Sequence, residues 1–415
     1  MTEKSISSAI NQDRLWERHM ELAKIGATSK GGVNREAFTN EEIKARKLLA
    51  KWSENRGFSC SIDPIGNLFF RREGKNPDSE PVVTGSHIDS QPTGGKFDGA
   101  YGVLAGLEVL ESAEDLGIET NRPLEFVAWT NEEGGRFQPA TMGSGVYVGA
   151  MDFKEMLNVS DNNGIKVSDV LPEALNAIPA ANKRDFATPM AAYIEAHIEQ
   201  GPILERQDKT IGVVTGIQGC RWFAIDVFGS EAHAGSTPFA LRRDAFKAAH
   251  SMISNMYEIF KDDEDILRFT VGRFEVSPNS PNTIPGKVFF TVDFRHPDSK
   301  ILSKLGDQIE GICEKNCNGL KFQIKETYTV PPTIFDQNVV DTIRRSANSH
   351  NFSVMDITSG ALHDAKYMND ICPSGMIFIP CEGGLSHNEL EAAQSEDIAA
   401  GARVLAETMI SLANQ

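Results

Sequence analysis

Short apolar runs that resemble buried strands alternate with helix-like segments, and this alternation constrains the fold more than any other feature. The predicted strands are residues 81–85, 124–130, 191–196 and 376–380. Apolar residues recur at helical spacing in residues 11–26, 40–56 and 99–113. Strands that alternate with helices form a mainly parallel sheet covered on both faces. We therefore expect an α/β fold whose larger domain is built on such a sheet.

A different pattern occupies residues 212–329. The β-rich runs WFAIDVF, LRFTVGRFEV, KVFFTVDFRH and LKFQIKETYTV are separated by helical stretches at 239–260 and 298–314. Every second residue from Val288 to Phe294 is apolar, as expected for an antiparallel sheet covered on one face. We expect residues 1–211 and 330–415 to form the larger domain. Residues 212–329 should form a smaller, ferredoxin-like α+β domain inserted into it.

Charge and composition exclude several classes of partner. The 415-residue chain has a formal net charge of −17, which argues against nucleic acid and anionic membranes. An anionic substrate would therefore need a local basic residue. No apolar run approaches the roughly 20 residues that span a bilayer, and the N-terminal run MTEKSISSAINQDRLWERH lacks a signal-peptide core. The six cysteines show no disulfide-framework spacing, so we expect a reduced, cytoplasmic protein.

Histidines and acidic residues follow the predicted strands of the larger domain. The set is His87, Asp98, Glu132, Glu133, His197 and His387. Ligands of parallel sheets gather at the carboxyl ends of the strands, so these side chains should share one site. Imidazole and carboxylate are the ligands that a pair of Zn²⁺ or Mn²⁺ ions prefers. An adjacent Glu pair can supply one ligand and one general base, so the pattern favours a two-metal hydrolase.

Each of these residues also has a structural interpretation. A lone loop histidine is more often hydrogen-bonded than metal-bound, and Asp98 precedes Gly99 at a predicted helix start, where Asp can cap the helix. Glu195 and Glu199 flank His197 and compete with it as ligands on spacing alone. Adjacent carboxylates after a buried strand are costly unless a cation compensates them. This cost favours the metal interpretation for the set as a whole.

Eight collinear motifs resemble the N-carbamoyl-L-amino-acid hydrolase family, and the resemblance as a whole runs from about residue 10 to the C-terminus. They are GSHIDSQPTGGKFDGAYG, TNEEGGRFQPATMGS, EAHIEQGPILE, EAHAGSTPFALRRDA, SPNTIPG, DFRHP, SGALHDA and SHNELE. This family includes β-ureidopropionases and allantoate amidohydrolases, and shares a dimetal superfamily with aminoacylases and carboxypeptidases. The resemblance implies a dimetal catalytic domain with an inserted domain that serves as lid and dimerisation surface.

The resemblance also implies a ligand set. His87 and His197 would hold one metal together with Asp98. Asp98 would bridge to a second metal, which Glu133 and His387 would hold. Two divalent ions per subunit are implied, Zn²⁺ or Mn²⁺, with Co²⁺ and Ni²⁺ as further options.

Other roles carried over from the family concern catalysis and substrate. Glu132 would be the general base, and His233 would reach the partner subunit's site and polarise the scissile carbonyl. The implied substrate contacts are Gln200, His233, Asn282, Arg295 and Gly360. A planar guanidinium can bind a carboxylate through two hydrogen bonds, which is a physical reason for arginine at position 295. Leu362 stands where relatives often have glycine, which alters the local pocket.

The implied reaction removes the N-carbamoyl group from an N-carbamoyl-L-amino acid and gives amino acid, CO₂ and ammonia. The enzyme would act as a homodimer on a small ureido acid. Allantoate and N-carbamoyl-β-alanine are alternative substrates, and a peptidase or N-acyl deacylase is a more distant alternative. A metal-stabilised binding protein is a non-enzymatic alternative. Glu132 argues against it, because a scaffold does not need a general base.

Overall fold

The computed structural model describes residues 6–415, so the first five residues of the polar N-terminal run lie outside the described residues. The described chain forms two compact units. The larger unit consists of two segments, the chain up to Thr215 and Ile334–Gln415, and the smaller unit is Gly216–Thr333. Within residues 6–415, no helix combines the length and apolar character that crossing a membrane requires.

Four parallel strands form the centre of the larger unit, in the order β17-β6-β3-β4. They are β3 (Val82–His87), β4 (Leu124–Trp129), β6 (Ala192–Ile198) and β17 (Ser374–Ile379). Every residue of these strands is buried, as expected for parallel strands covered on both faces. The predicted α/β fold with a mainly parallel central sheet is confirmed.

Further strands extend this sheet to ten strands among the described residues. Beyond β4 lie β2 (Leu68–Arg72), β1 (Ser59–Ile62) and β5 (Asn182–Lys183). Beyond β17 lie β7 (Ile211–Ile217), β15 (Thr333–Ile334) and β16 (Val354–Ser359). The neighbours of the parallel strands, β2 and β7, run antiparallel to them.

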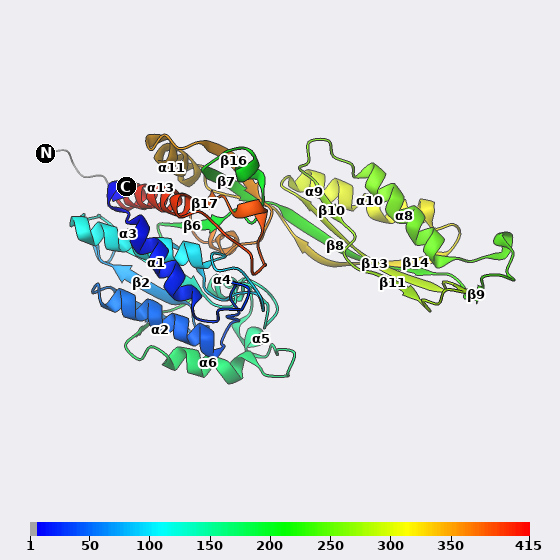
Figure 1. Cartoon of the computed structure of the whole chain (residues 1–415), viewed down its shortest axis with the longest axis horizontal. Helices are drawn as coiled ribbons and strands as arrows, with labels where there is room; N and C mark the ends of the chain where they lie inside the picture. The colour runs from blue at the N-terminus through cyan, green and yellow to red at the C-terminus, as the bar shows by residue number, and fades with distance from the viewer. Residues whose placement is uncertain (1–5) are drawn as a thin grey trace. The chain divides into compact units, whose positions relative to one another are not determined.

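Helices α3 (Ala100–Leu116) and α13 (Ser395–Ala413) pack against the parallel strands, and α1 (Gln12–Ala23) and α11 (Gln337–Ser349) pack on these helices (Figure 1). Glycine allows α3 to approach the sheet closely, because a Cβ at Gly102 would lie 2.4 Å from the carbonyl oxygen of Ala196. The remaining helices of this unit are η1 (Ile6–Ala9), α2 (Asn40–Glu54), α4 (Met142–Tyr147), α5 (Phe153–Leu157), α6 (Val167–Asn176), α7 (Ile203–Arg206), α12 (Ala365–Met368) and η3 (Glu382–Gly384).

Two of the predicted strands end later than the sequence pattern indicates. The β3–β4 ladder continues to the pair His87–Trp129, and the β6–β17 ladder continues to Ile198–Ile379. His87 is therefore the last residue of β3, and His197 lies inside β6 rather than after it. The backbone pairing extends past the apolar run because polar side chains at a strand end can turn into a site without breaking the ladder.

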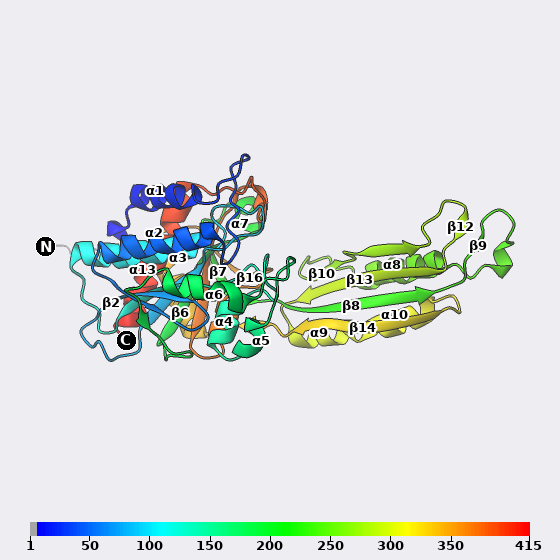
Figure 2. The same ribbon diagram turned by 90° about the horizontal axis from the view of Figure 1, so that it is seen from below.

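The smaller unit is an antiparallel sheet covered by helices on one face. Within residues 216–333 its strands are β8 (Gly219–Phe228), β10 (Arg268–Thr270), β11 (Phe274–Ser277), β13 (Lys287–His296) and β14 (Lys321–Val330). Figures 1 and 2 show it with α8 (Ala245–Ile259), α9 (Ser299–Gly306) and α10 (Gln308–Asn316). On β13, Val288, Phe290, Val292 and Phe294 are buried in one cluster with residues of α8 and α10. The alternation seen in the sequence is thus explained by a one-sided core.

Both predicted helical stretches of this unit differ in detail. Residues 239–241 form a separate turn, η2 (Phe239–Leu241), and α8 begins only at Ala245, where the Asp244 carboxylate accepts two N–H hydrogen bonds of the first turn. The second stretch is divided at Asp307 into α9 and α10. A small ladder of β9 (Ala232–His233) and β12 (Thr283–Ile284) completes the unit.

Candidate metal centre

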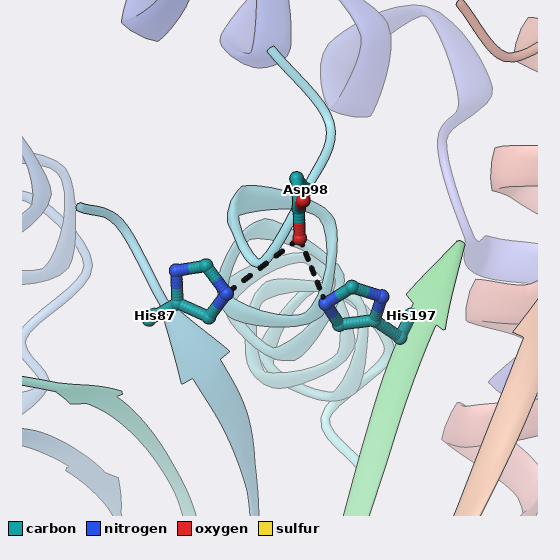
Figure 3. Close-up of side chains that lie close together, drawn as sticks. All are labelled: His87, Asp98 and His197. Carbon is teal, nitrogen blue, oxygen red and sulfur yellow. Dashed lines mark ion pairs between the residues drawn. The ribbon is translucent and has the colours of Figure 1, made fainter. Parts of the chain in front are cut away.

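His87, Asp98 and His197 meet at the carboxyl ends of parallel strands. His87 closes β3, His197 projects from β6, and Asp98 lies two residues before the first residue of α3 (Figure 3). Asp98 Oδ1 lies 3.7 Å from His87 Nε2 and 3.3 Å from His197 Nε2. All three residues are buried, and their potential ligand atoms lie within 4.8 Å of one another. This spacing can accommodate one metal ion.

A second group uses the other oxygen of Asp98. Asp98 Oδ2 lies 3.5 Å from His387 Nε2, and this nitrogen lies 3.2 Å from Glu133 Oε2. The side chain of His387 is 52% exposed, whereas that of Asp98 is 4% exposed. A cleft of about 590 Å³ opens beside His387 and is also lined by Lys30 and Leu390. The second group is therefore accessible from solvent.

Hydrogen bonds set the ring orientation of the two buried histidines. His87 Nδ1 lies 2.9 Å from the carbonyl oxygen of Asp89, and His197 Nδ1 lies 2.8 Å from that of Ile198. A carbonyl oxygen can only accept, so each Nδ1 carries the hydrogen and donates it. In the neutral rings, both Nε2 lone pairs then point towards Asp98. This is the tautomer and orientation that metal ligands need.

Gly99 brings Asp98 into this position. It adopts a φ of +62°, and a Cβ there would lie 2.3 Å from His87 Nε2. Gly99 is the N-cap residue of α3, and no side chain caps this helix start. The carboxylate of Asp98 is therefore directed to the histidines, and the capping interpretation of this residue is wrong.

Glu132 and Glu133 follow β4 and point to different parts of the centre. The Asp89 carboxylate accepts hydrogen bonds from the N–H groups of both residues, at 3.1 and 3.2 Å. Glu132 Oε2 then lies 3.4 Å from His87 Nε2. Glu133 Oε2 faces the second group, and Gln91 Nε2 donates to it at 2.8 Å. The adjacent residues Glu132 and Glu133 thus reach different groups, Glu132 beside His87 and Glu133 beside His387.

Several carboxylates are buried close together in this centre, an arrangement that bound cations would stabilise. Burial raises the pKa of Glu132 well above its ordinary value, and the neighbouring carboxylates add to this effect. Burial also opposes ionisation of Asp98, but a protonated His197 donates a hydrogen bond to it, and this bond together with the charges of His197, His87 and His387 lowers the pKa of Asp98. Among residues 6–415, the ion-pair partners of Asp98, Glu132 and Glu133 are histidines. Imidazole and carboxylate donors around buried acids whose ion-pair partners are histidines fit divalent metal ions.

The two glutamates that flank His197 have other partners. The Glu199 carboxylate accepts two N–H hydrogen bonds at the start of α7, at 2.8 and 2.7 Å. Glu195 accepts from the Ser86 hydroxyl at 2.7 Å and from the Ala365 N–H at 2.8 Å. Both carboxylates are thus engaged in holding elements of the larger unit together, which favours His197 as the ligand from this segment.

Gln200 also reaches the centre. Its Nε2 donates to Asp98 Oδ2 at 2.9 Å and to Ser386 Oγ at 3.2 Å. Its Oε1 is buried and has no hydrogen-bond partner among residues 6–415. Gly360 lies in the loop between β16 and α12. In the same loop, the His363 ring packs edge-on against His197, with centroids 4.5 Å apart.

The remaining predicted residues belong to the smaller unit. The β9–β12 ladder places His233 beside Asn282, and both side chains are exposed. His233 Nδ1 accepts two backbone N–H hydrogen bonds, at 3.0 and 3.2 Å, so the neutral ring carries its hydrogen on Nε2. Arg295, on β13, forms an ion pair with Asp293 at 2.8 Å. Their contribution to the metal centre stays a prediction.

Four residues that hold the ligands were missed by reasoning from the sequence. They are Asp89, Gln91, Ser386 and Glu391. Each lies within five residues of a candidate ligand, inside a motif already identified. Their position in those motifs was the available signal. Their partners were not predictable, because all four contact segments distant in the chain.

The sequence and the fold of the chain are similar to those of known amidohydrolases and of one peptidase family. Residues 83–411 match the model of peptidase family M20/M25/M40. The chain is 42% identical to an N-carbamoyl-L-amino-acid amidohydrolase of Rhizobium meliloti, over 97% of both chains. It is 32% identical to an allantoate amidohydrolase of Bacillus subtilis, over 94% of this chain and 95% of the relative. The crystal structure of a hydantoinase/carbamoylase family amidase from Burkholderia multivorans superposes with a TM-score of 0.91, at 46% identity over 98% of both chains.

Proposed function

The chain belongs to peptidase family M20/M25/M40, and from this premise we propose that it is an amidohydrolase that removes the N-carbamoyl group from an N-carbamoyl-L-amino acid. The products would be the amino acid, CO₂ and ammonia. The observation that carries the proposal is the position of Asp98, which offers one oxygen to each of two potential ligand groups beside Glu132. The name of the Rhizobium meliloti relative supports the substrate class.

The proposed metal ligands are the two groups described above. His87, His197 and Asp98 would hold one ion, and Asp98, Glu133 and His387 the other. Zn²⁺ and Mn²⁺ suit this mixture of nitrogen and oxygen donors, as do Co²⁺ and Ni²⁺. When bound, such ions supply Lewis acidity for a water molecule and for the ureido carbonyl.

Glu132 is the proposed general base. Asp89 fixes its backbone, and its carboxylate lies beside His87 without being needed to complete either ligand group. Glu132 would take a proton from the attacking water as water adds to the ureido carbon. When a C–N bond breaks, the departing nitrogen would receive that proton, and the remaining carbamate would lose CO₂. The proton count balances with one carboxylate.

Several residues are proposed to orient the substrate. The unpartnered Oε1 of Gln200 is an acceptor for a ureido N–H, which would satisfy a buried atom. Arg295 and Asn282 would bind the substrate carboxylate, and Gly360 would offer a backbone contact. An N–H on Nε2 of His233 suits a hydrogen bond to the ureido carbonyl oxygen.

We also propose that the protein is a homodimer in which His233 of the partner subunit completes each site. The smaller unit would serve as lid and dimerisation surface. A cytoplasmic location, and the absence of nucleic acid or membrane partners, stay predictions from sequence.

A substrate panel tests the proposed function. Ammonia release and amino-acid formation should be compared for N-carbamoyl-L-amino acids, their D-enantiomers, N-carbamoyl-β-alanine, allantoate and N-acetyl-L-amino acids. We expect the highest kcat/KM for an N-carbamoyl-L-amino acid. Allantoate is the second candidate because of the Bacillus subtilis relative, and a clear preference for it would reassign the substrate. A preference for N-acetyl amino acids or dipeptides would overturn the ureido proposal.

A further inference from the structure

Glu391 connects the two loops that supply Asp98 and His387. It is 2% exposed, and its Oε1 accepts hydrogen bonds from the N–H groups of Phe97 and Asp98, at 2.8 and 3.0 Å. Its Oε2 accepts from the hydroxyl of Ser386 at 3.0 Å. A single buried carboxylate therefore contacts the backbone of one candidate ligand and the residue next to another.

The surrounding residues leave space specifically for this carboxylate. A Cβ at Gly95 would lie 1.9 Å from Cδ of Glu391, so any side chain larger than hydrogen at position 95 would displace the carboxylate. On the other side, Glu391 N–H donates to the carbonyl oxygen of Asn388 at 3.0 Å, which closes the turn after His387. The loop and the Asp98 segment are thus shaped around one another.

Counting hydrogens shows that Ser386 is shared. Its hydroxyl lies 2.8 Å from Asp98 Oδ2 and 3.0 Å from Glu391 Oε2, yet it has one hydrogen to donate. Gln200 Nε2 has two hydrogens and donates to Asp98 Oδ2 and to Ser386 Oγ. Asp98 Oδ2, the oxygen that faces His387, is therefore oriented by a network that ends at Glu391.

His387 is the ligand that most needs this support. Its backbone has a φ of +52°, which lies in the left-handed region that residues other than glycine rarely adopt. Such a conformation persists only where the surrounding structure holds it. Its side chain is half-exposed, unlike the buried rings of His87 and His197. Contacts to its loop must therefore supply the order that burial gives the other histidines.

We propose that Glu391 is a positioning residue that fixes Asp98 and His387 relative to one another, and so sets the affinity of the metal position they share with Glu133. The inference rests on the proposed function of these residues as metal ligands. Residues that orient metal ligands typically change metal affinity by roughly 10–100-fold when mutated. Asp98 belongs to both ligand groups, but the larger effect should fall on the position shared with His387 and Glu133, because His87 and His197 are oriented by other contacts.

Calorimetric titration of metal-depleted protein with Mn²⁺ tests the proposal without any substrate. The wild type should bind two ions per chain. Glu391→Ala should weaken one of them by roughly 10–100-fold and affect the other, which His87 and His197 also hold, clearly less. Glu391→Gln keeps an oxygen for the N–H groups of Phe97 and Asp98 but cannot accept from Ser386, so its loss should be smaller. Glu389→Ala is the matched control, because Glu389 lies in the same loop and pairs with Lys30.

The outcomes separate positioning from a purely structural role. Unchanged Mn²⁺ affinity in Glu391→Ala, or equal weakening of both ions together with a lower melting temperature, overturns the proposal. Should the alanine variant fail to fold, the glutamine variant decides, and wild-type affinity for both ions would contradict the role. A wild type that binds fewer than two ions overturns the ligand assignment as well. A wild type that binds two ions with this pattern but cleaves no ureido acid would refute only the proposed substrate.

Discussion

The two compact units present their candidate functional residues in opposite ways. In the larger unit, His87, Asp98 and His197 are buried at the carboxyl edge of the parallel sheet, and hydrogen bonds to nearby backbone carbonyl oxygens orient the two histidine rings. In the smaller unit, His233 and Asn282 are exposed on a short ladder. The first arrangement is organised before any ligand arrives. The second depends on a partner or substrate to give it a role.

This difference follows from the two kinds of sheet. Parallel strands direct their carboxyl ends to one edge, so residues far apart in sequence converge there. The antiparallel sheet of the smaller unit buries one face in its own core, and its polar residues lie outside that core. We therefore propose that the larger unit holds the metals and transfers the proton, and that the smaller unit adds contacts to the substrate carboxylate and carbonyl. The predictions below test that division.

The largest effect should come from Glu132, because it is the proposed proton carrier of the larger unit. Glu132→Gln keeps the shape of the side chain but cannot accept a proton, so kcat should fall by roughly 10²–10⁴-fold. Metal content, measured by elemental analysis, should stay at the wild-type value, because Glu133 fills the ligand position. Loss of metal or near-normal turnover would show that Glu132 has a different role.

Arg295 should give a smaller effect that appears mainly in KM. Hydrogen bonds to charged groups contribute about 1.5–3 kcal/mol, so Arg295→Ala should raise KM for an N-carbamoyl acid by roughly 10–100-fold. Arg273→Ala is the matched control, since Arg273 pairs with Glu275 two residues away, as Arg295 pairs with Asp293. The amide of the same substrate should be poor for the wild type. Equal KM changes in both variants, or equal turnover of acid and amide, would remove Arg295 from recognition.

The smallest effect, a partial recovery, concerns the proposed shared site. Glu132→Gln chains and His233→Ala chains should each be nearly inactive as homodimers. A mixed dimer contains one site with both residues intact, so its activity should rise towards half that of the wild type. The two chains need different affinity tags so that mixed dimers can be isolated. Inactive mixed dimers, or active monomers in sedimentation, would confine each site to a single chain.

Reasoning from the sequence predicted the parallel sheet, and it predicted that the candidate ligands lie close together, as the structure has them. Buried runs such as LEFVAWT and MIFIP have few alternatives in a chain of this composition, and residues after them converge by topology. The exact ends of β3 and β6 were not predictable, because the ladders extend into polar residues. The hydrogen-bond partners of Asp89 and Glu391 were not predictable either, because they lie far away in the sequence. Glu391 contacts Asp98 across 293 residues, a pairing that no local pattern encodes.

The central claim is that two metal ions, held on either side of Asp98, are required for hydrolysis. It is tested most directly by adding Mn²⁺ in known equivalents to metal-depleted protein and following ammonia release from an N-carbamoyl-L-amino acid. We expect negligible activity without metal and a plateau at two equivalents per chain. A plateau at one equivalent, or full activity in verified metal-free protein, would contradict the claim.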